Sequence, residues 1–119
     1  MANMPGDFLS LGGVNAPTST RQQPSRVLDV PFLISPARPA LATYGVDIET
    51  DAGAGIEVLS DGANPPTTII AQAGIGTPTP GAGAILSVTA FVYPGHYVLV
   101  RTYGVTTAES MSVVTEVIL

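Results

Sequence analysis

The sequence predicts an all-β protein: an antiparallel β-sandwich or jelly-roll-like domain of about seven strands, preceded by an extended N-terminal arm. Three observations lead to this fold class. From Arg26 onward, hydrophobic residues recur with the two-residue period of β-strands. Turn signals rich in Gly and Pro interrupt these runs about every 8–12 residues. No stretch shows the period of an amphipathic helix.

Residues 1–25 are expected to form the arm, and residues 26–119 the β-domain. Gly, Pro, Ser, Thr and Asn recur throughout the first segment and leave no room for a long helix or a central strand. Phe8, Leu9 and Leu11 are a small apolar group within it. Fully extended, such an arm would reach about 80 Å, far enough to lie along a neighbouring protein. A disordered tail is the alternative.

The first two strands of the domain differ in the clarity of their pattern. Residues 25–35 alternate, but Pro31 has no amide donor, which predicts an edge strand or a partly paired lead-in. Residues 40–50 alternate clearly, which predicts one core face and one outer face. The predicted core residues of this strand are Ala42, Tyr44, Val46 and Ile48, and the predicted outer residues are Thr43, Gly45, Asp47 and Glu49. The remaining strands are expected at 56–60, 67–73, 85–93, 96–103 and 110–119.

The predicted strand 96–103 is apolar on both faces. Val98 and Val100 lie on one face, whereas the other face combines two tyrosines with a leucine and an arginine. A sandwich strand usually shows one polar face to water, so we expect another layer or another subunit to cover the second face. Aromatic residues and Arg are also enriched at protein interfaces. Together with one residue of the last strand, the predicted subunit-interface residues are Tyr97, Leu99, Arg101, Tyr103 and Val117.

Composition restricts the possible partners. Only 11% of the residues are charged and the net charge is −5, whereas soluble domains carry about 25% charged residues. This low charge predicts that other chains cover much of the surface. The four basic residues are all arginines, too few for the basic stripe that nucleic-acid binding requires. The apolar stretches are short and interrupted, so no membrane contact is expected.

No catalytic or metal-binding motif stands out. His96 is the only histidine and the chain has no cysteine, so a transition-metal site is poorly supplied. No nucleophile motif accompanies His96, which is expected to flank a Pro94-Gly95 turn. Asp47, Glu49 and Asp51 share one strand face and would suit a hard cation, although a solvated face is the expected role. We therefore predict no enzyme activity and no cofactor.

Four segments resemble a known family in their order and approximate spacing. They are SRVLDVPFLIS (25–35), YGVDI (44–48), PGHYVLVRT (94–102) and VVTEVIL (113–119). In these segments the chain is similar to small virion proteins and terminal fibre domains of tailed bacteriophages. The resemblance spans residues 25–119, except for the middle loops. It implies a β-rich structural domain of a phage particle.

The function expected from this resemblance is that of a capsid decoration or cement protein on the capsid surface of the virion. The β-domain would form a homo-oligomer, a trimer or a dimer, and the arm would anchor it on the major capsid protein or another virion protein. The arm residues expected to make this contact are Phe8, Leu9, Leu11, Arg21 and Arg26. The alternative is a head-fibre or tail-fibre domain whose loops 61–66 and 74–84 bind host-surface carbohydrate. Neither loop contains an aromatic residue to stack on a sugar.

Overall fold

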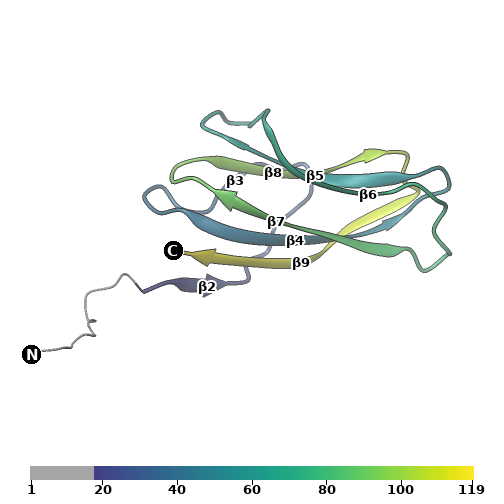
Figure 1. Ribbon diagram of the computed structural model, residues 1–119, viewed down its shortest axis with the longest axis horizontal. Coiled ribbons are helices and arrows are strands. Elements are labelled where there is room, and N and C mark those ends of the chain that lie inside the picture. The colour runs from purple at the N-terminus through teal and green to yellow at the C-terminus, as the bar shows by residue number, and fades with distance from the viewer. Residues whose placement is uncertain (1–17) are drawn as a thin grey trace, which may run out of the picture.

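The computed structural model describes residues 18–119 and shows two stacked layers of strands (Figure 1). Within these residues the chain forms eight strands and no helix. The strands are β2 (Thr20–Gln22), β3 (Phe32–Leu33), β4 (Ala40–Glu49), β5 (Ala54–Asp61), β6 (Ile69–Ile75), β7 (Ala84–Val92), β8 (Tyr97–Gly104) and β9 (Ala108–Ile118).

The strands pair into two antiparallel sheets of four strands. Sheet 1 has the order β2-β9-β4-β7, and sheet 2 has the order β3-β8-β5-β6. All the pairings between neighbours are antiparallel. The prediction of an all-β, sandwich-like domain is therefore confirmed.

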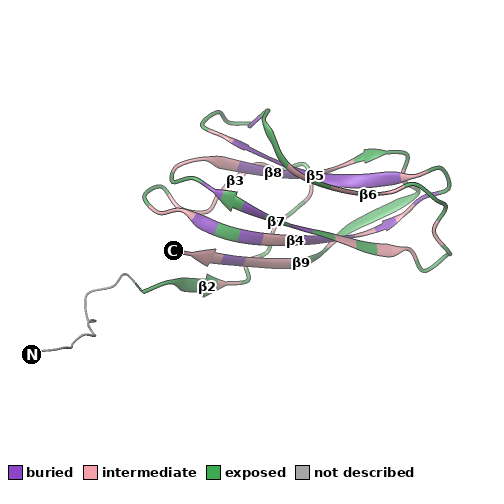
Figure 2. Cartoon of the chain, viewed as in Figure 1, coloured by how far each residue is buried: buried purple, intermediate pink, exposed green. Residues whose placement is uncertain are grey.

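The core lies between the two sheets, as the alternation along β4 predicts. Tyr44, Val46 and Ile48 are fully buried against residues of sheet 2 such as Ile56 and Val100. Figure 2 shows buried stretches along β4 and β5. Burial of one such aliphatic side chain contributes about 1.5–3 kcal/mol, so this two-sided core stabilises the domain without disulfides.

The N-terminal part of the domain fits the prediction only in part. Phe32 and Leu33 pair at the edge of sheet 2, as predicted for an edge strand or a partly paired lead-in. The rest of the segment 25–35 is not a strand, because Asp29 has φ 65° and Val27 and Val30 close a turn around it. Upstream, β2 lies inside the predicted arm, where its residues pair with Glu116 to Ile118 of β9. Within the described residues, strand pairing is thus present from Thr20, upstream of Arg26, and the segment between β2 and β4 passes from sheet 1 to sheet 2 and back.

Arg38 fixes the corner where both ends of the described chain meet. Its Nε donates to the carbonyl of Leu119 at 2.5 Å, and its Nη2 donates to the carbonyl of Thr18 at 2.9 Å. Residues 1–17, and with them the predicted anchor residues Phe8, Leu9 and Leu11, lie outside the described residues.

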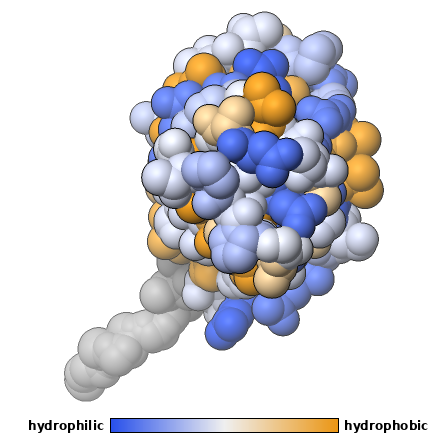
Figure 3. Space-filling model, turned by 90° about the vertical axis from the view of Figure 1, so that its right-hand side faces the viewer, coloured by the Kyte–Doolittle hydropathy of each residue, from blue (hydrophilic) through white to orange (hydrophobic). Residues whose placement is uncertain are grey.

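Thr50 ties the loops together at the opposite end of the domain. Its amide donates to Thr79 Oγ1 at 2.9 Å, and its hydroxyl donates to the carbonyl of Val105. The Gly53 amide donates back to Thr50 Oγ1 at 2.9 Å. Figure 3 looks onto this end and shows hydrophilic and hydrophobic residues interspersed.

Candidate functional site

A buried carboxylate, Glu116, holds the N-terminal segment to the domain. Arg26 donates to it twice, from Nη2 to Oε1 at 2.8 Å and from Nε to Oε2 at 3.0 Å. The Tyr44 hydroxyl donates to Oε2 at 2.7 Å, and Gln22 Nε2 donates to Oε1 at 2.9 Å. The Arg26 guanidinium also lies 4.1 Å from the centroid of the Phe32 ring, a cation–π contact. These contacts link β2, β3, β4 and β9.

The protonation of this cluster follows from its contacts. Burial alone would raise the pKa of Glu116, but the hydrogen bonds from Arg26, Tyr44 and Gln22 outweigh it and lower the pKa below its usual value. Burial raises the pKa of Tyr44 far above its usual value, and the adjacent Glu116 charge raises it further. The Arg26 guanidinium is therefore bound to Glu116 within the chain, whereas the sequence predicted that it would contact the capsid.

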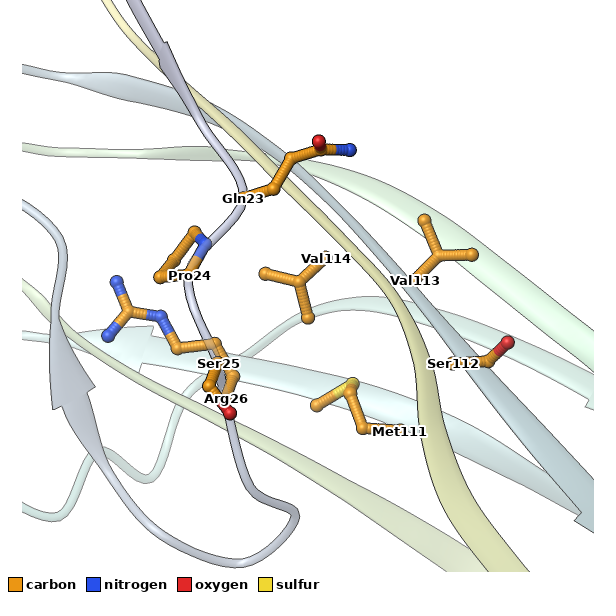
Figure 4. A pocket seen from close by; sticks show the side chains of 8 residues that line it. All are labelled: Gln23, Pro24, Ser25, Arg26, Met111, Ser112, Val113 and Val114. Carbon is orange, nitrogen blue, oxygen red and sulfur yellow. The ribbon is translucent and has the colours of Figure 1, made fainter.

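A groove lies between this N-terminal segment and the bulged part of β9. It measures about 390 Å³ and is lined by residues 23–26 and 111–114. Figure 4 shows Met111 and Val114 pointing toward the segment, whereas the Arg26 guanidinium points away from the groove. The groove therefore offers a ligand no free charged group, and we assign it no binding or catalytic role.

The outer face of sheet 1 carries exposed hydrophobic side chains. Leu41 and Phe91 lie directly opposite each other on β4 and β7, with 45% and 49% of their surface exposed. Ile85 and Val113 are also exposed and pack over Gly45, where a Cβ would lie 3.0 Å from Val113 Cβ. This surface is called the sheet 1 outer face. Its residues used below are Leu41, Thr43, Gly45, Ile85, Thr89, Phe91, Val113 and Val117.

Charge is confined to the margins of the sheet 1 outer face. Arg21, a predicted anchor residue, is exposed at the β2 edge and lies opposite Val117. Asp47 and Glu49 lie on the same face toward the far end of β4. In the middle, the hydroxyls of Thr43 and Thr89 are 2.8 Å apart and hydrogen-bond to each other.

The predicted interface residues of β8 share one face of sheet 2, as expected, but Val117 lies on sheet 1. Leu99 faces Leu59, and both are already buried within the single chain, with 8% and 1% exposed. Arg101 Nε lies 3.1 Å from Glu57 Oε2. This face is thus largely occupied by contacts within the chain.

Tyr103 completes that face by lying over two glycines. A Cβ on Gly55 or on Gly74 would collide with the Tyr103 side chain. The missing side chains of neighbouring β5 and β6 therefore make the space that the tyrosine fills.

A second cavity lies at the end of the sandwich where the 61–68 and 93–96 loops meet. It measures about 380 Å³ and is called the end pocket. Three aromatic rings form one side: Phe91 and Tyr93 meet edge to face with centroids 5.5 Å apart, as do Tyr93 and His96. The residues that line it are Ser60, Asp61, Thr68, Ile70, Phe91, Tyr93 and His96.

The backbone turn that presents His96 is the predicted one. The His96 amide donates to the Tyr93 carbonyl at 3.2 Å, and Gly95 adopts φ 76° between them, a conformation that favours glycine. The prediction of a Pro94-Gly95 turn next to His96 is therefore confirmed.

The polar side of the end pocket comes from β5 and the loop after it. The amides of Thr67 and Ala63 donate to the Asp61 carboxylate at 2.9 and 2.8 Å, and Thr68 donates from both its amide and its hydroxyl. These hydrogen bonds lower the pKa of Asp61 to about 2. The Ser60 hydroxyl is buried and has no hydrogen-bond partner among the described residues.

Ser60, Asp61 and His96 meet in the end pocket but do not form a catalytic triad. A triad needs a serine hydroxyl bonded to the histidine and a carboxylate bonded to the other ring nitrogen. Ser60 Oγ bonds to neither, and Asp61 is held by its own loop. Over residues 18–119, no group of three His, Cys, Asp or Glu side chains is arranged to hold a metal ion, and this includes Asp47, Glu49 and Asp51.

Comparison with protein-family models, with curated proteins and with solved structures finds no match to this chain. In the described part of the chain, no helix has the length and apolar character needed to cross a membrane.

Proposed function

We propose that this chain is a structural, non-catalytic component of a tailed-bacteriophage virion. It would decorate or cement the capsid surface and associate with other copies of itself through the sheet 1 outer face. The exposed hydrophobic side chains of that face are the single observation that carries this proposal. The low charge of the whole chain supports it, because an isolated domain has little reason to expose such a face.

We infer further that the two sheets form a jelly roll. Among the described strands, the first pairs with the last (β2 with β9), the second with the next to last (β3 with β8), and β4–β7 and β5–β6 complete the series. This is the pairing of one long hairpin wrapped into two sheets. Jelly rolls occur in viral capsid and lectin domains, which supports a virion role by analogy of fold.

The sheet 1 outer face suits a second copy of the chain. Two such faces would pack about 10 Å apart and bury Leu41, Ile85 and Phe91 of both copies. The hydroxyls of Thr43 and Thr89 already hydrogen-bond to each other, so covering them leaves only the O–H of the accepting threonine to be paired across the interface. The charges at the margin would lie in the solvated rim of the interface.

The N-terminal residues are proposed to grip the shell. Residues 1–17 contain the apolar group Phe8, Leu9 and Leu11, and they precede the corner that Arg38 fixes. Arg21 is exposed near this corner, so it stays in the proposed contact with the major capsid protein. Arg26 does not, because Glu116 holds its guanidinium.

Binding to isolated capsids tests this function. The full chain, a variant lacking residues 1–17 and an Arg38→Ala variant would be mixed with capsids that lack the protein, and bound chain measured after sedimentation. The deletion ends before Thr18 so that β2 is retained. We expect the full chain to bind and the deletion to lose binding. A full chain that does not bind capsids but binds the tips of phage fibres would favour the fibre-domain alternative.

A further inference from the structure

We propose that the end pocket binds one neutral hexopyranose unit of a glycan. This inference goes beyond the virion role. The end pocket lies at the same end of the sandwich as the Arg38 corner and shares Phe91 with the sheet 1 outer face, but its other lining residues lie outside that face. The inference is carried by the juxtaposition of an exposed aromatic wall with a buried, unpartnered hydroxyl and a fixed carboxylate in a cavity of about 380 Å³.

The aromatic wall is held in place and open to ligand. Tyr93 is 61% exposed, yet Phe91 and His96 flank it edge to face at interplanar angles of 78° and 75°. These contacts restrict the orientation of the tyrosine ring before any ligand arrives. One face of a pyranose is made of C–H groups, which stack on such a ring, while the phenol hydroxyl remains free to hydrogen-bond.

The polar side matches sugar hydroxyls, which both donate and accept. Ser60 Oγ does both as well, and its hydroxyl is buried without a partner in the described chain. Nearly all buried polar groups in proteins are hydrogen-bonded. A ligand hydroxyl in the pocket that Ser60 lines would supply the missing partner. Asp61 is oriented by the amides of its own loop and retains lone pairs for a further donor.

The charge of the lining favours a neutral sugar over an anionic one. Asp61 contributes a carboxylate, and its pKa of about 2 keeps it ionised at neutral pH. All four arginines of the chain are among the described residues, and none lines the pocket. A uronic acid or a phosphorylated sugar would therefore meet repulsion from Asp61 without a compensating arginine.

The 61–66 loop has no aromatic residue of its own, but the fold places two aromatic side chains from other segments beside it. Phe91 belongs to β7 and Tyr93 to the following turn, and the fold brings both beside Thr68 and Asp61. The other expected binding loop, 74–84, contributes Gly81 and Ala82 to a groove lined by acidic and small residues, with no aromatic side chain.

Amide chemical-shift titration tests the proposal with defined probes: the methyl glycosides of glucose, galactose and N-acetylglucosamine, with methyl glucuronide as the anionic comparison. We expect saturable shifts at Ser60, Thr68, Tyr93 and His96 with at least one neutral glycoside. Titration to about 50 mM would detect even a millimolar Kd, which is weak by the standards of protein–ligand binding.

Three variants show whether the named groups are responsible. Tyr93→Ala should weaken binding about tenfold and Ser60→Ala severalfold, whereas Tyr103→Ala, which alters an aromatic residue outside the pocket, should leave Kd unchanged. The same spectra report whether each variant is folded. Absence of saturable shifts with every neutral glycoside would overturn the proposal, as would tighter binding of the glucuronide or binding that survives both pocket substitutions.

Discussion

Arg26 and Glu116 lie 90 residues apart in the chain and form a two-point ion pair at the edge of the core. The contact joins the segment after β2 to β9. In this segment the chain leaves sheet 1 and continues to β3, which pairs in sheet 2. The Glu116 side chain is fully buried, and only 15% of the Arg26 side chain is exposed. Such a pair is costly to break, because the remaining charge stays buried without its partner.

Replacing Arg26 by Ala should lower the free energy of unfolding by about 3–5 kcal/mol, the usual effect of breaking a buried pair. Arg21→Ala is the matched control, because Arg21 is exposed on strand β2 and forms no ion pair with another described residue. The control should cost about 1 kcal/mol or less. Urea unfolding of both variants measures the difference, and equal losses would contradict the structural role of Arg26.

Stability should fall in acid because of Glu116. Its pKa is lower in the folded protein than the usual value of 4.5, so the folded state favours the ionised form. The resulting stabilisation is fully present above the pKa of the unfolded chain and is lost as the pH falls through the folded pKa. Asp61 also makes the protein less stable in acid, because its pKa falls from 3.8 to about 2 on folding.

Glu116→Gln should therefore show a shallower loss of unfolding free energy below pH 5 than the wild-type protein. Urea unfolding at a series of pH values measures these slopes. Asp61→Asn serves as a comparison, because its effect should begin near the lower usual pKa of 3.8 rather than near 4.5. Parallel curves for Glu116→Gln and the wild type would contradict the assigned cause.

Gly55→Ala should destabilise the domain by about 1–3 kcal/mol, the typical cost of overpacking. The added methyl group would collide with the Ala73 carbonyl oxygen and the Tyr103 ring. Gly62→Ala is the control, because a Cβ there meets no atom within 4 Å. Thermal unfolding compares the two, and a Gly55→Ala variant as stable as the control would show that Tyr103 does not lie over Gly55.

The sequence predicts the strands with strong alternation and misses those fixed by distant contacts. The pattern of Tyr44, Val46 and Ile48 is enough to identify β4 and its core face. In contrast, β2 is three residues long, carries no alternating pattern and is held by pairing with β9. One signal was present: Glu116 follows Val114 at the period of a core face, and a carboxylate there requires a buried partner.

The end pocket could not be predicted from the sequence, for a different reason. Its lining comes from β5, from the loop after it, from β6 and β7, and from the turn before β8. No local pattern indicates that Ser60 and Tyr93 share a cavity. The exposed side chains of the sheet 1 outer face were equally hidden, because Leu41, Ile85 and Val113 come from three strands that only the sheet order brings together.

Self-association through the sheet 1 outer face is tested most directly by sedimentation equilibrium of the wild-type chain and of a Leu41→Glu/Ile85→Glu variant. Both positions lie outside the end pocket and are exposed, so the variant should fold. Val27→Glu/Val105→Glu makes the same charge change at exposed sites elsewhere. We predict a dimer or trimer for the wild type and the control, and a 12.1 kDa monomer for the variant. A monomeric wild-type protein, or a variant that keeps the wild-type mass, would contradict this interface.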